Sequence, residues 1–288
     1  MIKSVLQRCA KYLLICIFDA FDILRLDTDK LIEQLQVRWL KKGRLNRRLF
    51  GGEENGSNII LYTEYIPDRY CAKYDVYKKT VNFLDFSDLE KWTKGNFRNN
   101  AGDITRFFFL NLCIDYLLEE NASGNVVELG VYRGNSAFLL NKFAQKIGAK
   151  CYLFDTFEGF DSRDLKGRDE HCNKTDFSDT SFEAVKTFLQ GGPNTVFVKG
   201  YFPESLKQID SVGELILVHI DCDLEKPMSD ALNYFYPKIK RGGFLIMHDH
   251  SSLYWAGAKY AIDEFFKDKP EFIVPIPDKS GSCVVRKT

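Results

Sequence analysis

The sequence predicts an α/β fold with a mixed sheet of seven strands, five of them parallel and the last two forming an antiparallel hairpin. Three observations predict it. Short apolar runs recur between residues 126 and 247, helical patterns separate them, and the chain ends in a turn between two apolar runs. Strands that are apolar throughout and alternate with helices are typical of a parallel sheet covered on both faces.

Five apolar runs are predicted as the parallel strands because each is too short for a buried helix. They are residues 126–129, 151–154, 195–198, 215–220 and 244–247. The antiparallel hairpin is predicted from runs 272–276 and 283–286, which flank the turn-forming residues 277–281.

The helices between these runs have recognisable starts and ends. Apolar residues recur at helical spacing after Asp103, which is expected to cap that helix. Thr180 and Glu183 have the spacing of a capping box, and Gly191-Gly192 are expected to end the helix that follows. Pro227 is expected to start another helix, with Gly242-Gly243 at its end.

Residues 1–95 are predicted to form a helical, basic extension that could serve as an oligomer contact, a lid or a membrane contact. Residues 96–288 are predicted to form one large domain. The first 50 residues carry eleven basic and five acidic side chains, and residues 38–48 hold six basic residues and no acid. Such a segment could contact an anionic membrane surface or nucleic acid, or be a solvated helix face in a homo-oligomer contact, which we favour. The apolar run 12–18 is too short to span a bilayer and is interrupted by Asp19, so neither a signal peptide nor a membrane anchor is expected.

The charge balance and the distribution of cysteines indicate which partners and which compartment to expect. Forty basic residues balance forty acidic ones, so nucleic acid is not expected as a partner. The eight cysteines are scattered without a C-x-x-C motif, and several lie inside apolar runs. This usage suits reduced thiols packed as small hydrophobic groups in a cytoplasmic protein.

A glycine-containing loop, residues 128–134, follows the first predicted strand and leads into a helix near Ser136. Glycines at Gly130 and Gly134 would let a ligand approach the backbone, and the helix start offers free N–H groups. The alternative is an ordinary turn between strand and helix. Because the spacing is G-x-x-x-G rather than G-x-G-x-x-G, a dinucleotide site is disfavoured.

Acidic and imidazole side chains follow three other strands. Asp155 ends the second strand, where a carboxylate can accept hydrogen bonds from ribose hydroxyls, unless it is an exposed capping residue. The fourth strand runs into residues 219–223 and the fifth into residues 248–250, so Asp221, His248 and Asp249 are expected at one edge of the sheet. They could hold Mg²⁺ or another divalent ion, or serve as a general base.

The alternative for this cluster is structural. Asp223 and Asp249 could cap the helices that follow, and His219 lies inside its strand, where a core position is favoured. For Asp221 and Asp249 together we favour a functional role.

Several segments in this order resemble one known family, the macrocin O-methyltransferase type of S-adenosylmethionine-dependent enzymes, which methylate sugar hydroxyls of macrolides and related glycans. The similar segments lie at 128–134, 154–159, 176–181, 199–203, 221–224, 236–238 and 242–243. The resemblance covers roughly residues 100–288 and implies a Rossmann-like sheet that binds S-adenosylmethionine.

The resemblance also implies site roles. The glycine loop would hold the methionine part of the cofactor, Asp155 its ribose, and residues 200–202 would lie near the adenine. The residues expected to bind the cofactor are Glu128, Gly130, Tyr132, Gly134, Ser136, Asp155, Thr156, Gly200, Tyr201 and Asp221. In the family a divalent metal is held by the acid matching Asp221 and an acidic pair, but here His248 replaces the first acid of that pair, and it could be a ligand or a base.

The predicted function is S-adenosylmethionine-dependent methylation of a hydroxyl on a sugar or glycosylated small molecule, with Asp221, His248 and Asp249 as catalytic and metal-binding residues. The pocket wall is expected from residues 60–100 and 161–176. Two other functions remain open: a nucleotide-cofactor sugar oxidoreductase, and a non-catalytic or membrane-associated scaffold with the same fold.

Overall fold

The computed structural model describes residues 83, 88, 91, 92 and 103–288. The chain divides into two compact units, Met1–Val81 and Asn82–Thr288, and all of the described residues belong to the second. The helix, oligomer contact and membrane contact predicted for the first 50 residues lie outside the described residues.

The predicted seven-stranded mixed sheet is confirmed. Its strand order is β3-β2-β1-β4-β5-β7-β6, with β1 to β5 parallel and β7 antiparallel to both β5 and β6. The strands are β1 (Asn125–Leu129), β2 (Cys151–Asp155), β3 (Thr195–Lys199), β4 (Leu215–Ile220), β5 (Ile239–Met247), β6 (Val274–Pro275) and β7 (Cys283–Arg286). The order reverses between β1 and β4, where open α/β sheets bind their ligands.

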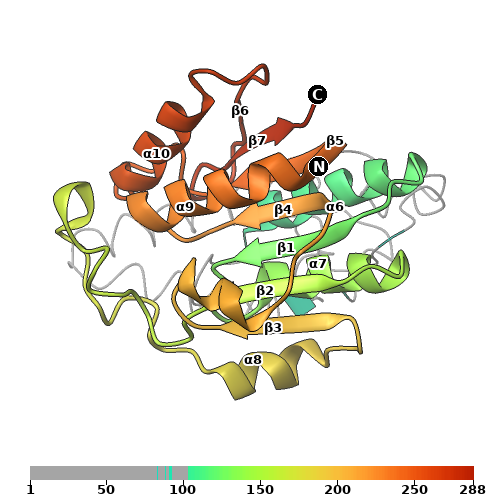
Figure 1. Cartoon of the computed structure of the whole chain (residues 1–288), viewed down its shortest axis with the longest axis horizontal. Helices are drawn as coiled ribbons and strands as arrows, with labels where there is room; N and C mark the ends of the chain where they lie inside the picture. The colour runs from blue at the N-terminus through green and yellow to red at the C-terminus, as the bar shows by residue number, and fades with distance from the viewer. Residues whose placement is uncertain (1–82, 84–87, 89–90, 93–102) are drawn as a thin grey trace, which may run out of the picture. The chain divides into compact units, whose positions relative to one another are not determined.

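Helices cover both faces of the sheet (Figure 1). On one face α9 (Glu225–Phe235) packs on β4, and α10 (Ala256–Phe266) packs on α9. On the other face α7 (Asn135–Lys146) contacts β1 and β2, with α6 (Ile104–Glu119) and α8 (Phe182–Leu189) beside it. The arrows of β1 to β4 point the same way, so their carboxyl ends form one edge, beyond which the long loop between β2 and α8 extends (Figure 1).

Two helix starts show how local sequence sets the elements. Asp103 caps α6 as predicted, accepting a hydrogen bond from the backbone N–H of Arg106 at 3.1 Å. The α8 cap differs from the prediction by one residue, because Ser181 accepts from the N–H of Ala184. The Thr180 hydroxyl instead donates to the carbonyl oxygen of Tyr132, which ties α8 to the glycine loop.

The expected end of α9 at Gly242-Gly243 is wrong. The helix ends at Phe235, a short 3₁₀ turn over Tyr236–Lys238 follows, and both glycines lie inside β5. Pro237 lacks the N–H that a continuing helix would need. A Cβ at Gly243 would lie 2.9 Å from the carbonyl oxygen of Ile216, so the two strands approach too closely there for any other residue.

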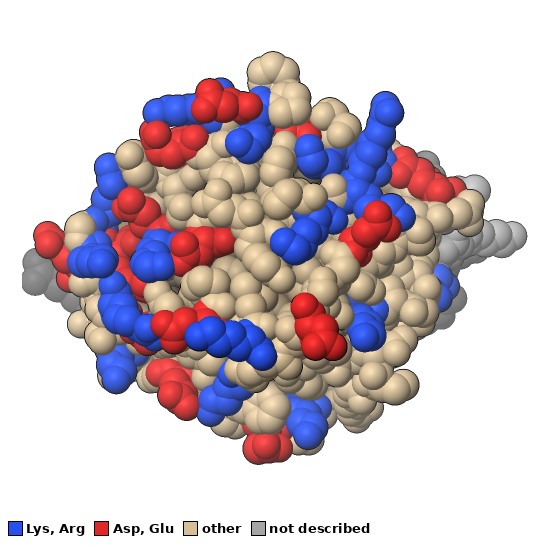
Figure 2. Space-filling view, in the orientation of Figure 1, with Lys and Arg blue, Asp and Glu red and all other residues tan. Residues whose placement is uncertain are grey.

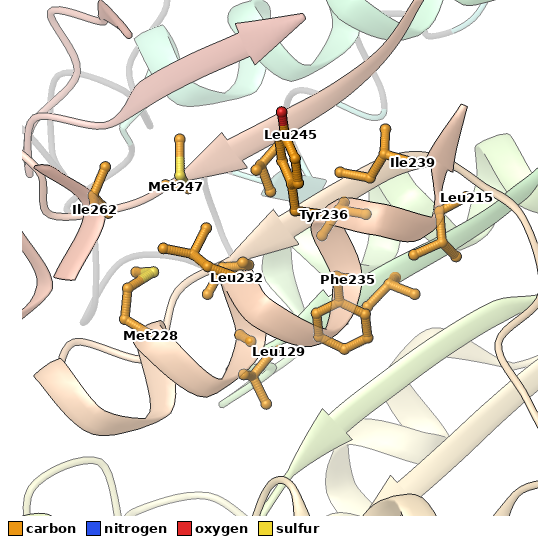
Figure 3. Packing of buried hydrophobic residues seen from close by; sticks show 14 of the residues in the cluster. Leu129, Leu215, Met228, Leu232, Phe235, Tyr236, Ile239, Leu245, Met247 and Ile262 are labelled. Carbon is orange, nitrogen blue, oxygen red and sulfur yellow. The ribbon is translucent and has the colours of Figure 1, made fainter. Parts of the chain in front are cut away.

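The core between the sheet and the α9–α10 layer is built from apolar side chains of both. Leu215, Leu232 and Phe235 are fully buried, and Leu245 nearly so. Figure 3 shows the α9 side chains filling the space against β4 and β5. Replacing one of these large side chains by alanine costs about 2–5 kcal/mol, so this layer holds the strand ends firmly in place.

The C-terminal hairpin forms as predicted, although β6 is shorter than expected. Asp278 accepts a hydrogen bond from the N–H of Ser282 at 2.7 Å, and Gly281 has a φ of 72° in the turn. Pro275 has no N–H to donate, but the N–H of Ile276 still donates to the carbonyl oxygen of Ser282 at 2.7 Å. Phe272, expected to begin the strand, is 89% exposed and lies outside it.

Some of the residues that the sequence assigns to the N-terminal extension lie in contact with the sheet domain. Trp92 is 1% exposed, and its indole Nε1 donates to the carbonyl oxygen of Asp103 at 3.2 Å. Lys142 of α7 forms an ion pair of 2.7 Å with Asp88. At least these two side chains therefore belong to the same unit as the sheet.

Surface charges of both signs are interspersed over the face shown in Figure 2. In the part of the chain that the structure describes, no helix combines the length and the apolar character needed to cross a membrane. The cysteines described are free, at positions 113, 151, 172, 222 and 283.

Candidate functional site

A cavity of about 260 Å³ lies at the carboxyl edge of the parallel strands. The loops after β1, β2, β3, β4 and β5 all contribute to its lining, together with α6 and the hairpin turn. The predicted cofactor-binding residues all line it except Glu128 and Gly134, and so do Asp221, His248 and Asp249. The prediction that residues 161–176 build part of the wall is confirmed by Asp161 and Asp164.

Gly130 is required by the packing of its loop against the end of β4. Its φ is 90°, and a Cβ there would lie 1.8 Å from the carbonyl oxygen of Asp221. The N–H of Asp221 in turn donates to the carbonyl oxygen of Leu129 at 2.8 Å. The glycine thus brings the two loops that flank the pocket into backbone contact, a reason that differs from the predicted approach of a ligand.

Asp155 organises the glycine loop. Its Oδ2 accepts hydrogen bonds from the backbone N–H groups of Val131 at 2.7 Å and Tyr132 at 2.8 Å, and its Oδ1 accepts from Phe157 at 2.6 Å. Burial raises the pKa of this carboxyl, and the three N–H groups oppose that rise. A carboxylate has about four lone-pair sites, so one remains for a ligand hydroxyl, whereas the sequence suggested contacts to two.

Glu128 and His219 form a fully buried pair beneath the pocket. Glu128 Oε1 lies 2.9 Å from His219 Nδ1, and both side chains have no exposed surface. Burial raises the pKa of Glu128, and contact with His219 and Ser136 opposes the rise. The core position favoured for His219 is confirmed, and Glu128 faces this core rather than the pocket.

The loop after β3 places Gly200 and Tyr201 in the pocket lining. The Tyr201 hydroxyl donates to Asp164 Oδ1 at 2.8 Å, and the Arg163 guanidinium lies 3.7 Å from the centre of the Tyr201 ring. Burial, followed by the hydrogen bond to Asp164, raises the pKa of Tyr201. These contacts fix the ring at one end of the cavity.

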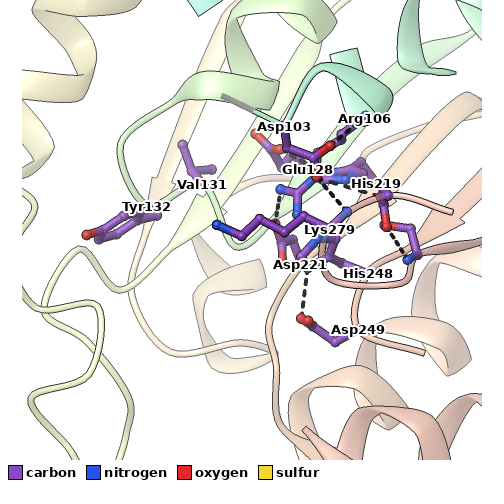
Figure 4. Close-up of polar contacts among 12 residues, drawn as sticks. Asp103, Arg106, Glu128, Val131, Tyr132, His219, Asp221, His248, Asp249 and Lys279 are labelled. Carbon is purple, nitrogen blue, oxygen red and sulfur yellow. Dashed lines mark hydrogen bonds and ion pairs between the residues drawn. The ribbon is translucent and has the colours of Figure 1, made fainter. Parts of the chain in front are cut away.

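Asp221, His248 and Asp249 meet in the same cavity, as the sequence predicts. His248 Nδ1 lies 2.6 Å from Asp221 Oδ1 and 2.8 Å from Asp249 Oδ2. Figure 4 shows His248 and Asp249 gathered around Asp221, with Arg106 on its other side. One donor atom from each of the three predicted residues falls within 4.8 Å of the others, a spacing that suits a metal ion.

The ionisable groups of this cluster shift one another's pKa values. Burial and Arg106 both oppose protonation of His248, but Asp221 and Asp249 outweigh them and raise its pKa to about 9. Burial opposes ionisation of Asp221, but His248 and Arg106 outweigh it and hold the pKa of this carboxyl below its usual range. Burial and the carboxylates of Asp249 and Asp221 raise the pKa of Asp223 well above its usual range.

The structural alternative for these acids is not supported. The N-cap of α9 is Leu224 and that of α10 is Trp255, and neither N-cap side chain caps its helix. The N–H of Glu225 at the start of α9 donates to Asp169 Oδ2 at 2.7 Å. Asp223 and Asp249 instead turn into the pocket with φ values of 63° and 62°. Non-glycine residues in this region are uncommon and concentrate at functional sites.

Sequence reasoning missed Arg106 and three aromatic residues of the pocket wall. Arg106 is 4% exposed, and its Nη1 lies 3.2 Å from Asp221 Oδ2. A charged residue among the apolar positions of α6 was the available signal. The aromatic residues Phe160, Phe177 and Trp255 lie on loops or at a helix start, where periodicity carries no information.

Comparison with known proteins agrees with this geometry. The family model described as macrocin-O-methyltransferase (TylF) matches residues 102–285. The chain is 26% identical over 157 residues to 8-demethyl-8-(2,3-dimethoxy-alpha-L-rhamnosyl)-tetracenomycin-C 4'-O-methyltransferase of Streptomyces olivaceus, which covers 49% of this chain and 59% of that protein. It is 22% identical over 238 residues to demethyldecarbamoylnovobiocin O-methyltransferase of Streptomyces niveus, with 74% and 88% covered.

Two solved structures share the fold. The O-methyltransferase NovP has a TM-score of 0.59 and 22% identity, covering 67% of this chain and 88% of its own. The calicheamicin methyltransferase CalS11 has a TM-score of 0.54 and 16% identity, covering 82% of this chain and 98% of its own. The family match spans more than half of the chain, from the start of α6 through the parallel strands to β7. The chain therefore belongs to the macrocin O-methyltransferase family.

Proposed function

We propose that this protein transfers a methyl group from S-adenosylmethionine to a hydroxyl group of a sugar. One observation carries the proposal. A single cavity joins the glycine loop and Asp155 at a nucleoside-binding edge to the Asp221–His248–Asp249 cluster. The curated relatives are named as O-methyltransferases of glycosylated compounds, which supports a sugar or glycosylated small molecule as the acceptor.

The pocket residues suit the cofactor in shape and charge. The carboxylate of Asp155 retains one lone-pair site for a ribose hydroxyl after binding three backbone N–H groups. Aspartates exceed arginines among the described lining residues, which favours a positively charged sulfonium. When bound, S-adenosylmethionine would supply an electrophilic methyl group.

The reaction centre would accept the proton of the attacking hydroxyl. Asp249 is 1% exposed and lines the pocket, and its Oδ1 has no hydrogen-bond partner among the described residues. A buried acceptor oxygen without a partner is costly, so a substrate hydroxyl that donates to it would be held strongly and aligned. Asp221 and His248 would hold Asp249 and share the charge that develops.

The same cluster fits a divalent metal. Carboxylate oxygens of Asp221 and Asp249 and one ring nitrogen of His248 would be its ligands, and Asp249 Oδ1 is a further unpartnered oxygen among the described residues. A metal held there would lower the pKa of the substrate hydroxyl. Imidazole in place of a carboxylate favours a transition metal over Mg²⁺.

Titration calorimetry with S-adenosylhomocysteine tests the cofactor assignment directly. Binding by the wild-type chain at micromolar protein is expected, and its absence would refute the proposal. Addition of NAD should leave the melting temperature unchanged, because a ligand that binds only the folded state raises it. A rise with NAD and none with S-adenosylhomocysteine would favour the oxidoreductase alternative.

Substitution tests the reaction centre. The double variant Asp221→Asn/Asp249→Asn should lose at least about a hundredfold in kcat while still binding S-adenosylhomocysteine. Asp210→Asn, at an exposed position outside the pocket, is the control. Full activity of the double variant would remove these residues from the mechanism. Chelation followed by Mg²⁺, Mn²⁺ or Zn²⁺ then tests the metal, because activity that survives chelation leaves the cluster as proton acceptor alone.

The sequence outside the described residues supports a further part of the proposal. The chain would act in the cytoplasm as a homo-oligomer, with the basic residues 38–48 in the contact between copies. Neutralising these residues should then change the mass measured by light scattering. Flotation of the full chain with anionic vesicles, lost on neutralisation, would instead support peripheral membrane contact.

A further inference from the structure

Asp169 lies on the long loop between β2 and α8, in a short 3₁₀ turn over Gly167–Asp169. It is 1% exposed, although most residues of this loop are exposed. Its Oδ2 accepts the backbone N–H of Glu225, the first residue of α9, at 2.7 Å. Because the N-cap residue Leu224 supplies no side-chain acceptor, Asp169 caps α9 from a segment that is distant in sequence.

The same carboxylate lies against the first turn of α10. A Cβ built at Gly257, the second residue of that helix, would lie 2.2 Å from Asp169 Oδ1 and 2.5 Å from Oδ2. Glycine is therefore required at 257, because the carboxylate occupies the space that a side chain would need. The N-cap residue Trp255 makes no side-chain cap either. The carboxylate thus lies between two helix N-termini, whose free N–H groups favour a negative charge.

The buried position of this carboxylate has a cost. Burial raises the pKa of Asp169, and the hydrogen bond from the N–H of Glu225 opposes that rise. Asp169 Oδ1 has no hydrogen-bond partner among the residues that the structure describes. Because a buried acceptor without a partner lowers stability, the free energy of folding alone does not explain an acid at this position.

The two helices lie side by side (Figure 1), and the neighbouring residue Arg168 joins them from the exposed side. Its Nη1 lies 3.0 Å from Glu225 Oε2 on α9, and its guanidinium lies 3.5 Å from the centre of the Tyr260 ring on α10. Its side chain is 46% exposed, so this bridge contributes little to stability. Asp169 and Arg168 therefore form a matched pair, one buried and one exposed, across the same two helices.

The helix starts that this carboxylate joins follow closely on the reaction centre. Only residues 222–224 separate Asp221 from α9, and residues 250–255 separate Asp249 from α10. A shift of either helix start is therefore passed on to the cluster, in which His248 Nδ1 lies 2.6 Å from Asp221 and 2.8 Å from Asp249. Misplacing a reacting group by about 1 Å can cost about a hundredfold in rate.

We propose that Asp169 is a positioning residue for methyl transfer. Its carboxylate fixes the starts of α9 and α10 relative to each other and thereby holds Asp221 and Asp249 at hydrogen-bonding distance from His248. Asp169 itself does not line the cavity, so it acts through these residues rather than on the substrate. The inference rests on the proposed function, which gives the cluster its part in the reaction.

Nuclear magnetic resonance of the His248 ring tests this geometry without any substrate. In protein made with isotope-labelled histidine, the ring N–H signal of His248 is identified by its loss in His248→Asn. Asp169→Asn should move this signal, because an amide carries no charge and turns an NH₂ group toward one of the two helix starts. Arg168→Met removes the exposed bridge between the same helices and should leave the signal in place.

Kinetics separates an effect on the cluster from an effect on the pocket wall, because the same loop carries the lining residues Asp161 and Asp164. The acceptor probe is the 4-nitrophenyl glycoside that the wild type methylates fastest. Asp169→Asn should lower kcat at least about tenfold, while the KM for the glycoside and the Kd for S-adenosylhomocysteine change less than about twofold. A raised KM with unchanged kcat would show that Asp169 positions the wall instead, and would overturn the proposal.

A double-mutant cycle tests the contact between Asp169 and α10. Replacing glycine by alanine in a helix usually stabilises it. Gly257→Ala should nevertheless lower the melting temperature of the wild type, because its Cβ would meet the carboxylate. In the Asp169→Ala background the same change should raise the melting temperature, since the space is then free. Additive effects of the two changes would contradict the contact and with it the proposal.

An unmoved His248 signal or an unchanged kcat in Asp169→Asn would overturn the positioning role. Equal effects of Asp169→Asn and Arg168→Met on both measurements would overturn it as well, because the buried carboxylate would then do no more than the exposed bridge. Failure of the wild type to bind S-adenosylhomocysteine would instead refute the proposed function. The His248 signal and the double-mutant cycle need neither cofactor nor acceptor, so the two failures are distinguishable.

Discussion

Arg106 on α6 forms an ion pair with Asp221 at the end of β4, with 3.2 Å between Nη1 and Oδ2. The same guanidinium lies 3.8 Å from the helix cap Asp103 and 4.0 Å from Asp278 in the hairpin turn. Asp103 Oδ2 also accepts the backbone N–H of Lys279 at 3.1 Å. Helix α6, the C-terminal hairpin and the reaction centre are thus joined through one buried cation.

Removing this cation should damage both stability and activity. Arg106→Met removes the guanidinium that Asp221 shares with Asp103 and Asp278, and loss of one partner of a buried pair costs about 3–5 kcal/mol. Because the Asp221 side chain is 18% exposed, we expect the lower end of that range. Arg106→Lys should lose less, since it keeps the charge but not the geometry. Chemical denaturation and kcat measure the two effects.

The matched control is Arg286→Met, which removes an arginine whose ion pair with Glu120 is about 40% exposed on both sides. That substitution should lower the free energy of unfolding by less than about 1 kcal/mol. If Arg106→Met and Arg286→Met destabilise the chain equally, Arg106 has no special role in the cluster.

Gly130→Ala should disrupt the pocket more than an ordinary loss of glycine. Its Cβ would lie 1.8 Å from the Asp221 carbonyl oxygen, so the two flanking loops must separate. Gly148→Ala is a close control, because φ is 69° there and nothing lies within 4 Å of the added Cβ. Gly148→Ala should cost about 1–2 kcal/mol from backbone strain alone, with unchanged S-adenosylhomocysteine affinity. Gly130→Ala should weaken that affinity at least about tenfold, and equal effects of the two changes would contradict this explanation.

Sequence pattern was sufficient for the sheet because each parallel strand contains a short apolar run, such as residues 215–218 of β4, a strand that is buried along its whole length. Strand order also placed Asp221 and Asp249 correctly at one edge, since parallel strands end together. The end of α9 could not be read in the same way. Two glycines such as those at 242–243 are expected both after the end of a helix and where two strands approach closely. The contact of Gly243 with the backbone of Ile216 shows that the second explanation applies here, and the sequence alone does not reveal that contact.

The site was less predictable because its details depend on contacts between residues distant in sequence. Arg106 and Asp221 are 115 positions apart. The sequence predicts that Asp155 accepts hydrogen bonds from both hydroxyls of a ribose. The backbone N–H groups of Val131, Tyr132 and Phe157 already occupy most of its acceptor sites. Glu128 lies one residue before the end of β1 and beside the glycine loop, yet its side chain contacts His219 in the core. Local sequence patterns do not show whether such a side chain points into the pocket or into the core.

The C-terminal contacts of Glu271 should make stability depend on acid pH. Burial opposes its ionisation, but Lys287, Tyr236 and Thr288 outweigh burial and lower its pKa to about 2. A depressed pKa contributes stability above the unfolded value near 4.5, and that contribution is lost as the pH falls toward 2. Glu271→Gln should therefore be less stable than the wild type by about 2 kcal/mol at pH 7, and the difference should narrow below pH 4.5.

Urea denaturation of both proteins between pH 7 and pH 3 measures this difference. Glu214→Gln is the control, because its side chain is 78% exposed and its change should stay below about 0.5 kcal/mol. A gap between Glu271→Gln and wild type that is constant across this range would show that the ionised carboxylate contributes nothing specific.

Asp155→Asn should uncouple the glycine loop from β2 and weaken cofactor binding. An amide has a single acceptor oxygen, so at least one of the three backbone N–H groups loses its partner, and charge-assisted bonds of this kind contribute about 1.5–3 kcal/mol each. We expect S-adenosylhomocysteine affinity to fall by at least about tenfold in calorimetry. Asp161→Asn provides the comparison, since Asp161 also accepts a backbone N–H, from Arg163 at 2.9 Å, but holds only its own loop. A loss as large in Asp161→Asn would mean that general pocket charge, rather than support of the glycine loop, accounts for the effect.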